Sequence, residues 1–203
     1  LDLLLLEIKG EVTGEIIFYG HSSGTLIATW LSFKLRQNHQ LKGLILGANF
    51  LLTETELQER VSSLNNMSDE EIWSYVSTGE EYLTNADAAS RQQVLDNVKR
   101  ETRLTHTLNA TLLELLQSNY KLQVPVHTVY GDSDFHLENY ESKYKSWNAV
   151  SDELEMTVIP KAHHLFISHN PIETSKILRN QIDKWKANEL SISDKNTISE
   201  KIN

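Results

Sequence analysis

The residues of this 203-residue chain that could carry out chemistry fall into three groups, far apart in the sequence. The first is Gly20-His21-Ser22-Ser23-Gly24, which matches the pattern G-x-S-x-G. In that pattern the serine lies on a strained turn between a strand and a helix, which exposes its hydroxyl as a nucleophile. An apolar run at 15–19 precedes the pattern and helically spaced apolar residues follow it. We therefore predict that Ser22 is a nucleophile.

Other interpretations of this segment remain open. A glycine-rich turn with a helix-capping serine would give the same five letters, and Ser23 offers a rival hydroxyl off the centre of the pattern. In the nucleophile interpretation, the backbone N–H of Ser23 is expected to point at the developing oxyanion. Gly20 and Gly24 are both expected to keep side chains out of the tight turn.

Two aspartates downstream of Ser22 are candidates for an orienting acid. A nucleophilic serine needs a general base, and that base needs an acid to orient it. Asp132 and Asp134 lie in the turn that follows a predicted buried strand at 124–130. Asp132 could instead hold the turn by bonding its own backbone, and Asp134 could be a surface acid. We prefer Asp134 as the acid and keep Asp132 as the alternative.

Two adjacent histidines, His163 and His164, are candidates for the base. They follow a predicted strand at 153–160, and open α/β sheets place their sites at the carboxyl ends of such strands. The order serine, acid, histidine along the chain is that of the α/β-hydrolase fold. We prefer His163 as the base, which would leave His164 as a neighbour that lines the site.

The remaining histidines have weaker support. His21 is expected to project away from Ser22 and to pack beside the substrate pocket, which His136, near Asp134, could also line. His127 alternates with its neighbours in a predicted strand, so a core or sheet-face role is expected. No histidine shows a zinc-ligand spacing such as H-E-x-x-H, so we predict no metal and no cofactor. Three histidines have no supporting context: His39, His106 and His169.

The elements that must position these groups follow an α/β pattern. A strand at 15–19, a helix at 23–37 and a strand at 42–48 form a βαβ unit, which predicts a parallel sheet. The α/β pattern returns with the strands that precede the aspartates and the histidines. A helix that begins near Pro171 closes it.

A block of about 70 residues interrupts this pattern. Residues 51–120 contain no convincing strand, and Ser68 with Glu71 predicts a capping box that opens a helix. A segment this long is a helical insertion rather than a loop. We therefore expect a core formed by 1–50 and 121–186, a helical insertion at 51–120, and a disordered polar tail at 187–203.

Composition excludes several classes of protein. The net charge of −9 without a basic stripe argues against nucleic-acid binding. No apolar run approaches the roughly 18 residues that span a membrane. The absence of cysteine excludes disulfides and thiolate metal sites, and it fits a reducing compartment such as the cytoplasm. Because the chain does not begin with Met, we expect it to be truncated at its N-terminus.

Four segments together resemble a known family. They are "FYGHSSGTLIATWLSFKL", "MSDEEIWSYV", "VPVHTVYGDSD" and "VIPKAHHLFI". They are similar to the nucleophile elbow, the start of the helical lid, the acid turn and the histidine loop of the type II (external) thioesterases. These enzymes accompany nonribosomal peptide and polyketide synthetases and have an α/β-hydrolase fold, with a mostly parallel sheet, flanking helices and a helical lid.

The resemblance implies an activity and a partner. It implies hydrolysis of acyl groups from the phosphopantetheine arm of an acyl or peptidyl carrier protein, with 51–120 as the lid. It maps the acid onto Asp134 and the base onto His163. The sequence departs from the family at Lys161-Ala162, where a glycine pair is usual, and it lacks the Arg-Ala-Asp stretch common late in the lid.

A further departure concerns the start of the chain. The family has several strands before the elbow, together with a loop that supplies a second oxyanion donor. Because only about 20 residues precede Ser22, we expect those strands and that loop to be absent from this chain. Two alternatives to a carrier thioesterase therefore remain: a small-molecule carboxylesterase or lipase, and a catalytically impaired module that binds a carrier without turnover.

Overall fold

The computed structural model describes residues 1–37, 40–78, 83, 85–118 and 120–200, and side chains as far as residue 188. The chain divides into two compact units. Unit 1 comprises Leu1–Asn49 and Lys121–Asn203, and unit 2 comprises Phe50–Tyr120. No helix in the described ranges is long and apolar enough to cross a membrane.

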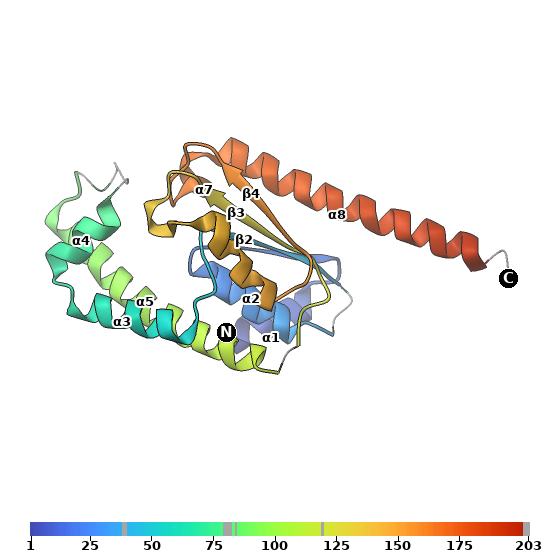
Figure 1. The fold of residues 1–203 in the computed structure, drawn as a ribbon, viewed down its shortest axis with the longest axis horizontal. Coiled ribbons are helices and arrows are strands. Elements are labelled where there is room, and N and C mark those ends of the chain that lie inside the picture. Colours follow the sequence, from blue (N-terminus) through green and yellow to red (C-terminus); the bar gives the residue numbers. More distant parts are fainter. Residues whose placement is uncertain (38–39, 79–82, 84, 119, 201–203) are drawn as a thin grey trace. The chain divides into compact units, whose positions relative to one another are not determined.

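Unit 1 is built on a four-stranded parallel sheet with the order β1-β2-β3-β4 (Figure 1). Since all four strands are parallel, their carboxyl ends lie along one edge of the sheet. The parallel sheet predicted from the sequence is confirmed. The strands are β1 (Ile16–His21), β2 (Leu41–Gly47), β3 (Val126–Gly131) and β4 (Leu154–Ile159).

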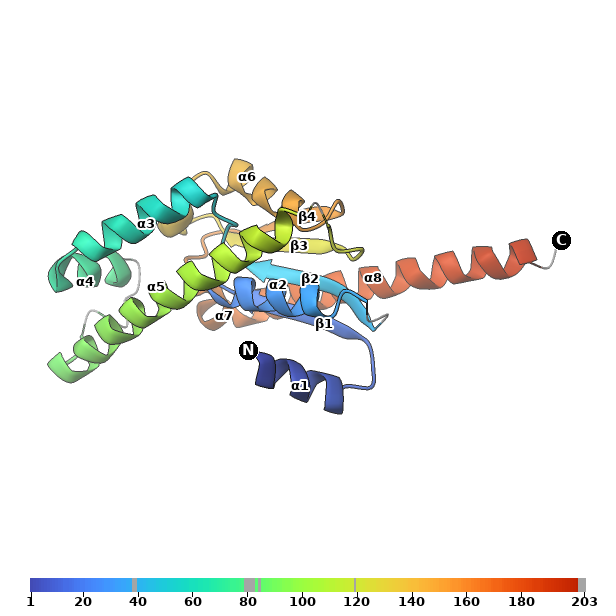
Figure 2. The same ribbon diagram turned by 90° about the horizontal axis from the view of Figure 1, so that it is seen from below.

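Helices cover both faces of this sheet. α2 (Gly24–Lys34) packs against β1 and β2, and α8 (Pro171–Glu200) packs against β2 and β4 on the opposite face (Figures 1 and 2). Gly43 in β2 makes room for α8, because a Cβ there would collide with the ring of Trp185. The central strands are therefore buried on both sides, which explains their continuous apolar runs.

Shorter elements complete unit 1. α1 (Asp2–Glu11) packs Leu5 and Ile8 against a cluster at the start of β1 and β2. The connections after β3 and β4 hold four short helices: η2 (Phe135–Leu137), α6 (Tyr140–Lys143), η3 (Tyr144–Ala149) and α7 (Phe166–His169).

The final helix corrects one expectation. Residues 187–200, predicted as a disordered tail, continue α8 to Glu200. This stretch contains neither glycine nor proline, the two residues that most strongly interrupt a helix. The end of the predicted tail, 201–203, lies outside the described residues.

The regular elements described in unit 2 are all helices. α3 (Glu54–Asn66), α4 (Asp69–Ser77) and α5 (Ala88–Leu116) form it, with α3 and α4 packed on α5. The capping box predicted for Ser68 and Glu71 is confirmed: the Glu71 N–H donates to Ser68 Oγ, and the Ser68 N–H donates to the Glu71 carboxylate.

Candidate active site

Ser22 lies on a sharp turn between β1 and α2. Its φ of 52° is in the left-handed region, which a residue with a side chain adopts at a cost in energy. The turn is fixed on both sides: Ser22 N–H donates to the Gly47 carbonyl at 2.8 Å, and Thr25 N–H donates to the Ser22 carbonyl at 3.0 Å. This is the geometry that a nucleophile elbow requires.

The two glycines of G-x-S-x-G do not have equal importance. A Cβ at Gly20 would collide with the backbone of Gly24 and Thr25, because β1 and α2 approach closely there. A Cβ at Gly24 would meet no atom within 4 Å. The expectation that both glycines keep the turn clear therefore holds for Gly20 and is wrong for Gly24.

Asn49 ties the elbow to the centre of the sheet. Its Nδ2 donates to the Ser22 carbonyl at 3.0 Å and to Thr25 Oγ1 at 2.8 Å. Its own carbonyl accepts from Tyr130 Oη at 3.0 Å and from Trp147 Nε1 at 3.1 Å. Sequence reasoning missed Asn49, although its place just after β2 was a signal, since sites gather at the carboxyl ends of parallel strands.

His164 links Ser22 to Asp134. The Nδ1 of His164 lies 2.8 Å from Asp134 Oδ2, and its Nε2 lies 3.0 Å from Ser22 Oγ. A carboxylate oxygen only accepts, so Nδ1 carries the proton and Nε2 accepts the Ser22 hydroxyl. The Asp134 side chain is 0% exposed and the His164 side chain 21% exposed, so the acid is shielded from water while the base is reachable.

His163 is not in this position, so the preference for it over His164 is wrong. Its Nδ1 lies 3.0 Å from the carbonyl oxygen of Ser133. The cause is the backbone of the preceding turn. Lys161 has a φ of 59°, its N–H donates to Asp132 Oδ1 at 2.6 Å, and the Ala162 carbonyl accepts from Ser133 N–H at 3.1 Å. With the turn held this way, the second histidine of the pair faces Ser22.

The two aspartates of this turn have different partners. Asp134 is buried and is hydrogen-bonded to His164, while its Oδ1 accepts from the His136 N–H at 3.0 Å. Asp132 is exposed, and its Oδ1 accepts the Lys161 N–H and the Ser133 hydroxyl. Asp132 therefore links its turn to the loop after β4, rather than bonding its own backbone as the alternative interpretation expected.

His21 packs, as expected, but it also makes two hydrogen bonds. Its ring meets Phe166 edge-on at 4.7 Å between centroids. Its Nε2 lies 2.9 Å from the His164 carbonyl oxygen, and its Nδ1 lies 3.2 Å from Tyr19 Oη. Burial, and then repulsion from His164, lower the pKa of His21 to about 4. His21 is therefore neutral at neutral pH.

The other predicted residues are placed as follows. Ser23 is the N-cap of α2, so its backbone N–H is at a helix N-terminus beside Ser22. The His136 ring lies edge-on to His164, with 5.4 Å between centroids. His127 is buried in β3, where its Nε2 lies 2.9 Å from Thr157 Oγ1. His39 lies outside the described residues.

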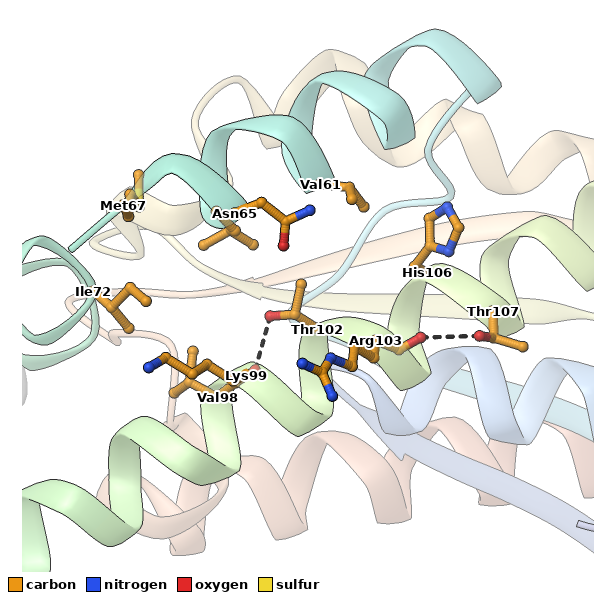
Figure 3. A pocket seen from close by; sticks show the side chains of 11 residues that line it. Val61, Asn65, Met67, Ile72, Val98, Lys99, Thr102, Arg103, His106 and Thr107 are labelled. Atoms are coloured by element: carbon orange, nitrogen blue, oxygen red, sulfur yellow. Dashed lines mark hydrogen bonds between the residues drawn. The ribbon is translucent and has the colours of Figure 1, made fainter. Parts of the chain in front are cut away.

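A separate cavity of about 540 Å³ lies inside unit 2 (Figure 3). Its wall on α5 carries the polar side chains of Lys99, Thr102, Arg103 and His106. Polar and apolar side chains contribute to the lining in similar numbers. The apolar lining comes from α3, α4 and α5 and consists of Val61, Leu64, Met67, Ile72 and Val98.

Comparison by sequence gives no relative. No protein-family profile matches the chain, and no curated protein matches it.

Comparison by structure does find similar folds. Human thioesterase 2 superposes with a TM-score of 0.63 at 18% identity, over 91% of this chain and 79% of that one. A thermophilic esterase gives 0.60 at 22% identity, over 91% and 71%. The type II thioesterase BorB from the borrelidin biosynthetic cluster gives 0.54 at 17% identity, over 88% and 70%. At these identities the likeness establishes the α/β-hydrolase fold.

Proposed function

We propose that this chain is a serine hydrolase that cleaves acyl thioesters. Ser22 is the nucleophile, His164 the general base and Asp134 the acid that orients it. One observation carries the proposal: a continuous line of hydrogen bonds from Asp134 Oδ2 through His164 to Ser22 Oγ. The serine in this line has the strained backbone that exposes a nucleophile.

Acylation follows from this geometry. Ser22 Oγ attacks the thioester carbonyl carbon while its proton passes to His164 Nε2. Asp134 holds the imidazole in the tautomer that can accept this proton and stabilises the imidazolium that forms. The tetrahedral oxyanion lies near the N-terminus of α2, where the Ser23 N–H donates to it. His164 then returns its proton to the departing thiolate, and the carbon–sulfur bond breaks.

Deacylation uses the same groups. Water attacks the acyl ester on Ser22, and His164 Nε2 takes the water proton. The second tetrahedral intermediate collapses as the proton returns to Ser22 Oγ, which releases the carboxylic acid and restores the enzyme. Every step is served by groups of this chain, so the proposed reaction calls for no cofactor.

The substrate we propose is an acyl or peptidyl group on the phosphopantetheine arm of a carrier protein. The sequence resemblance to type II thioesterases supports this, as does the structural likeness to BorB. We propose unit 2 as the lid that shapes the acyl pocket and meets the carrier, and the apolar side chains of its cavity, among them Val61, Leu64 and Ile72, would contact an acyl chain. Because the chain carries a net charge of −9, docking to an acidic carrier would rely on local apolar contacts.

The first test is thioester hydrolysis by purified wild-type protein and by Ser22→Ala. Loss of a triad nucleophile should lower kcat by at least about 10³-fold. Unchanged hydrolysis of an acyl-carrier thioester by Ser22→Ala would contradict the proposal.

An esterase of small oxygen esters is the second candidate, favoured by the likeness to the thermophilic esterase. The same triad would serve it. Comparing kcat/KM for matched acyl-carrier thioesters and p-nitrophenyl esters decides between the two substrates.

A carrier-binding module without turnover is tested with a fluorophosphonate probe. Stoichiometric labelling of wild type but not of Ser22→Ala would exclude an inert site. Carrier binding without any labelling would favour the module.

A further inference from the structure

His164 reaches Ser22 from the far side of the sheet. β1 and β4 are the two outer strands of the order β1-β2-β3-β4, so the loop after β4 must carry His164 across β2 and β3. Near β3 the loop is held by Asp132 and Ser133, which bond residues 161–163. Nearer to Ser22, a side chain at the end of β1 bonds the loop backbone: the His21 Nε2 lies 2.9 Å from the His164 carbonyl oxygen.

The bond to His164 fixes the tautomer of His21. A carbonyl oxygen only accepts, so the His21 Nε2–H donates to the His164 carbonyl at 2.9 Å. The His21 Nδ1 is then an acceptor, and Tyr19 Oη, 3.2 Å away, donates to it. Burial raises the pKa of Tyr19 to about 12, which keeps this hydroxyl protonated. The polar atoms of both side chains are therefore satisfied in a single arrangement.

Packing holds the His21 ring in this place. Phe166 meets the ring edge-on, and Gly47 at the end of β2 leaves space for the group. A Cβ at Gly47 would lie 3.0 Å from Tyr19 Oη, 3.1 Å from His21 Nδ1 and 3.1 Å from Phe166 Cζ. The neighbouring strand therefore presents its smallest residue where this cluster needs room.

We propose that His21 is a positioning residue for the base: by donating its Nε2–H to the His164 carbonyl, it holds His164 Nε2 within hydrogen-bond reach of Ser22 Oγ. This inference rests on the proposed hydrolase function. His21 acts through His164, since its own ring nitrogens bond Tyr19 and the His164 carbonyl. A shift of about 1 Å in a catalytic group can slow the reaction roughly 100-fold.

Three variants test the proposal. His21→Leu keeps an apolar side chain and removes the donor, and we expect kcat to fall roughly 10- to 100-fold with KM unchanged. His21→Gln can offer an amide N–H near the position of Nε2, and we expect kcat within about threefold of wild type. Tyr19→Phe removes only the hydroxyl, and a loss of about 3- to 10-fold is expected.

The pH profile separates positioning from a direct role. With His164 still the base, the acid limb of kcat/KM should stay at the same pH in His21→Leu while the plateau falls. Disappearance of that limb would overturn the proposal and give His21 the role of the base. A folded His21→Leu with wild-type kcat would also overturn it, as would a Gln variant as slow as the Leu variant.

Two further controls keep the outcome clear. Ser22→Ala is assayed alongside: if it stays active, the proposed function itself fails. If Ser22→Ala is inactive and His21→Leu is fully active, only the positioning role fails. If thermal unfolding shows that His21→Leu is not folded, the kcat values of Tyr19→Phe and His21→Gln decide whether His21 is a positioning residue. Wild-type kcat in Tyr19→Phe, or a tenfold loss in His21→Gln, would then reject the role.

Discussion

The Nε2 of His164 lies 3.0 Å from the Oγ of Ser22, although 142 positions separate the two residues. The neighbouring histidine, His163, bonds the Ser133 carbonyl instead. Both histidines lie in one loop and differ by a single step along the chain. The side that each one faces is therefore the property that decides which of them can serve as a base.

Substitution of the two histidines gives the sharpest prediction. His164→Ala should lower kcat for thioester hydrolysis by at least about 10³-fold, because the Ser22 hydroxyl loses its proton acceptor. His163→Ala removes a bond to a backbone carbonyl, and we expect kcat within about tenfold of wild type. Steady-state kinetics on both variants measures this. Equal losses would contradict the assignment of His164 as the base. A larger loss in His163→Ala would support His163 as the base, which the sequence analysis preferred.

The two aspartates provide a second matched pair. Asp134→Asn replaces the acceptor of His164 Nδ1–H and favours the wrong tautomer, so kcat should fall about 10⁴-fold with little change in fold. Asp132→Asn keeps an oxygen that can accept the Lys161 N–H, and kcat should stay within about threefold. Circular dichroism controls for folding. A slower Asp132→Asn than Asp134→Asn would exchange their roles.

The elbow glycines predict different effects on stability. Gly20→Ala would push a methyl group into the backbone of Gly24 and Thr25, so the free energy of unfolding should fall by about 2–4 kcal/mol or the protein should not fold. Gly24→Ala adds a methyl group in open space at the first residue of α2, so the free energy of unfolding should stay within about 1 kcal/mol of wild type. Urea unfolding of both variants checks this, and a Gly24→Ala as unstable as Gly20→Ala would be inconsistent with the elbow packing.

The sequence predicted most of what burial and periodicity dictate. Buried apolar runs located all four strands, and helical spacing located α2. The turn after a buried strand drew attention to both Asp132 and Asp134, because such turns lie at the carboxyl edge of the sheet, and the family resemblance indicated Asp134. These features depend on local sequence, which is why a single chain reveals them.

The remaining features depend on the folded backbone. The choice between His163 and His164 follows from the left-handed conformation of Lys161. The sequence does not indicate this conformation, because lysine rarely adopts it. Asn49 was missed because its partners, Ser22 and Tyr130, come from other strands. The hydrogen bonds of His21 depend in the same way on how the loop after β4 crosses the sheet.

Our proposal that unit 2 is the acyl-binding lid predicts an effect of its cavity on acyl-chain selectivity. Val61→Trp would fill part of the cavity, so kcat/KM should fall at least about tenfold for long-chain acyl thioesters and little for acetyl thioesters. Ser63→Trp, on the exposed surface of the same helix, is the matched control. The measurement is kcat/KM for a series of acyl-carrier thioesters whose acyl chains range from two to sixteen carbons, a difference of about 14 methylenes. Equal losses at every length would show that the cavity does not bind the chain.

His127 predicts how stability depends on pH. Burial in β3 lowers its pKa from 6.5, Lys184 lowers it further, and Glu155, whose Oε2 lies 3.7 Å from Nδ1, partly opposes this. Below pH 6.5 the unfolded chain therefore binds more protons at this residue than the folded chain does, so its contribution to stability is lost as pH falls.

The measurement is the free energy of unfolding at pH 7 and pH 5, a range that stays above the ordinary pKa of Glu155 at 4.5. His127→Gln cannot titrate and keeps a side-chain partner for Thr157, so its loss of stability between the two pH values should be smaller than that of wild type. Both proteins also contain His21, whose pKa is lowered to about 4. Its contribution to the pH dependence of stability is therefore the same in each and does not affect the comparison. Parallel curves of the free energy of unfolding against pH for wild type and His127→Gln would contradict this prediction. They would mean that His127 keeps an ordinary pKa in the folded chain, and that its burial beside Thr157 does not disfavour its charged form.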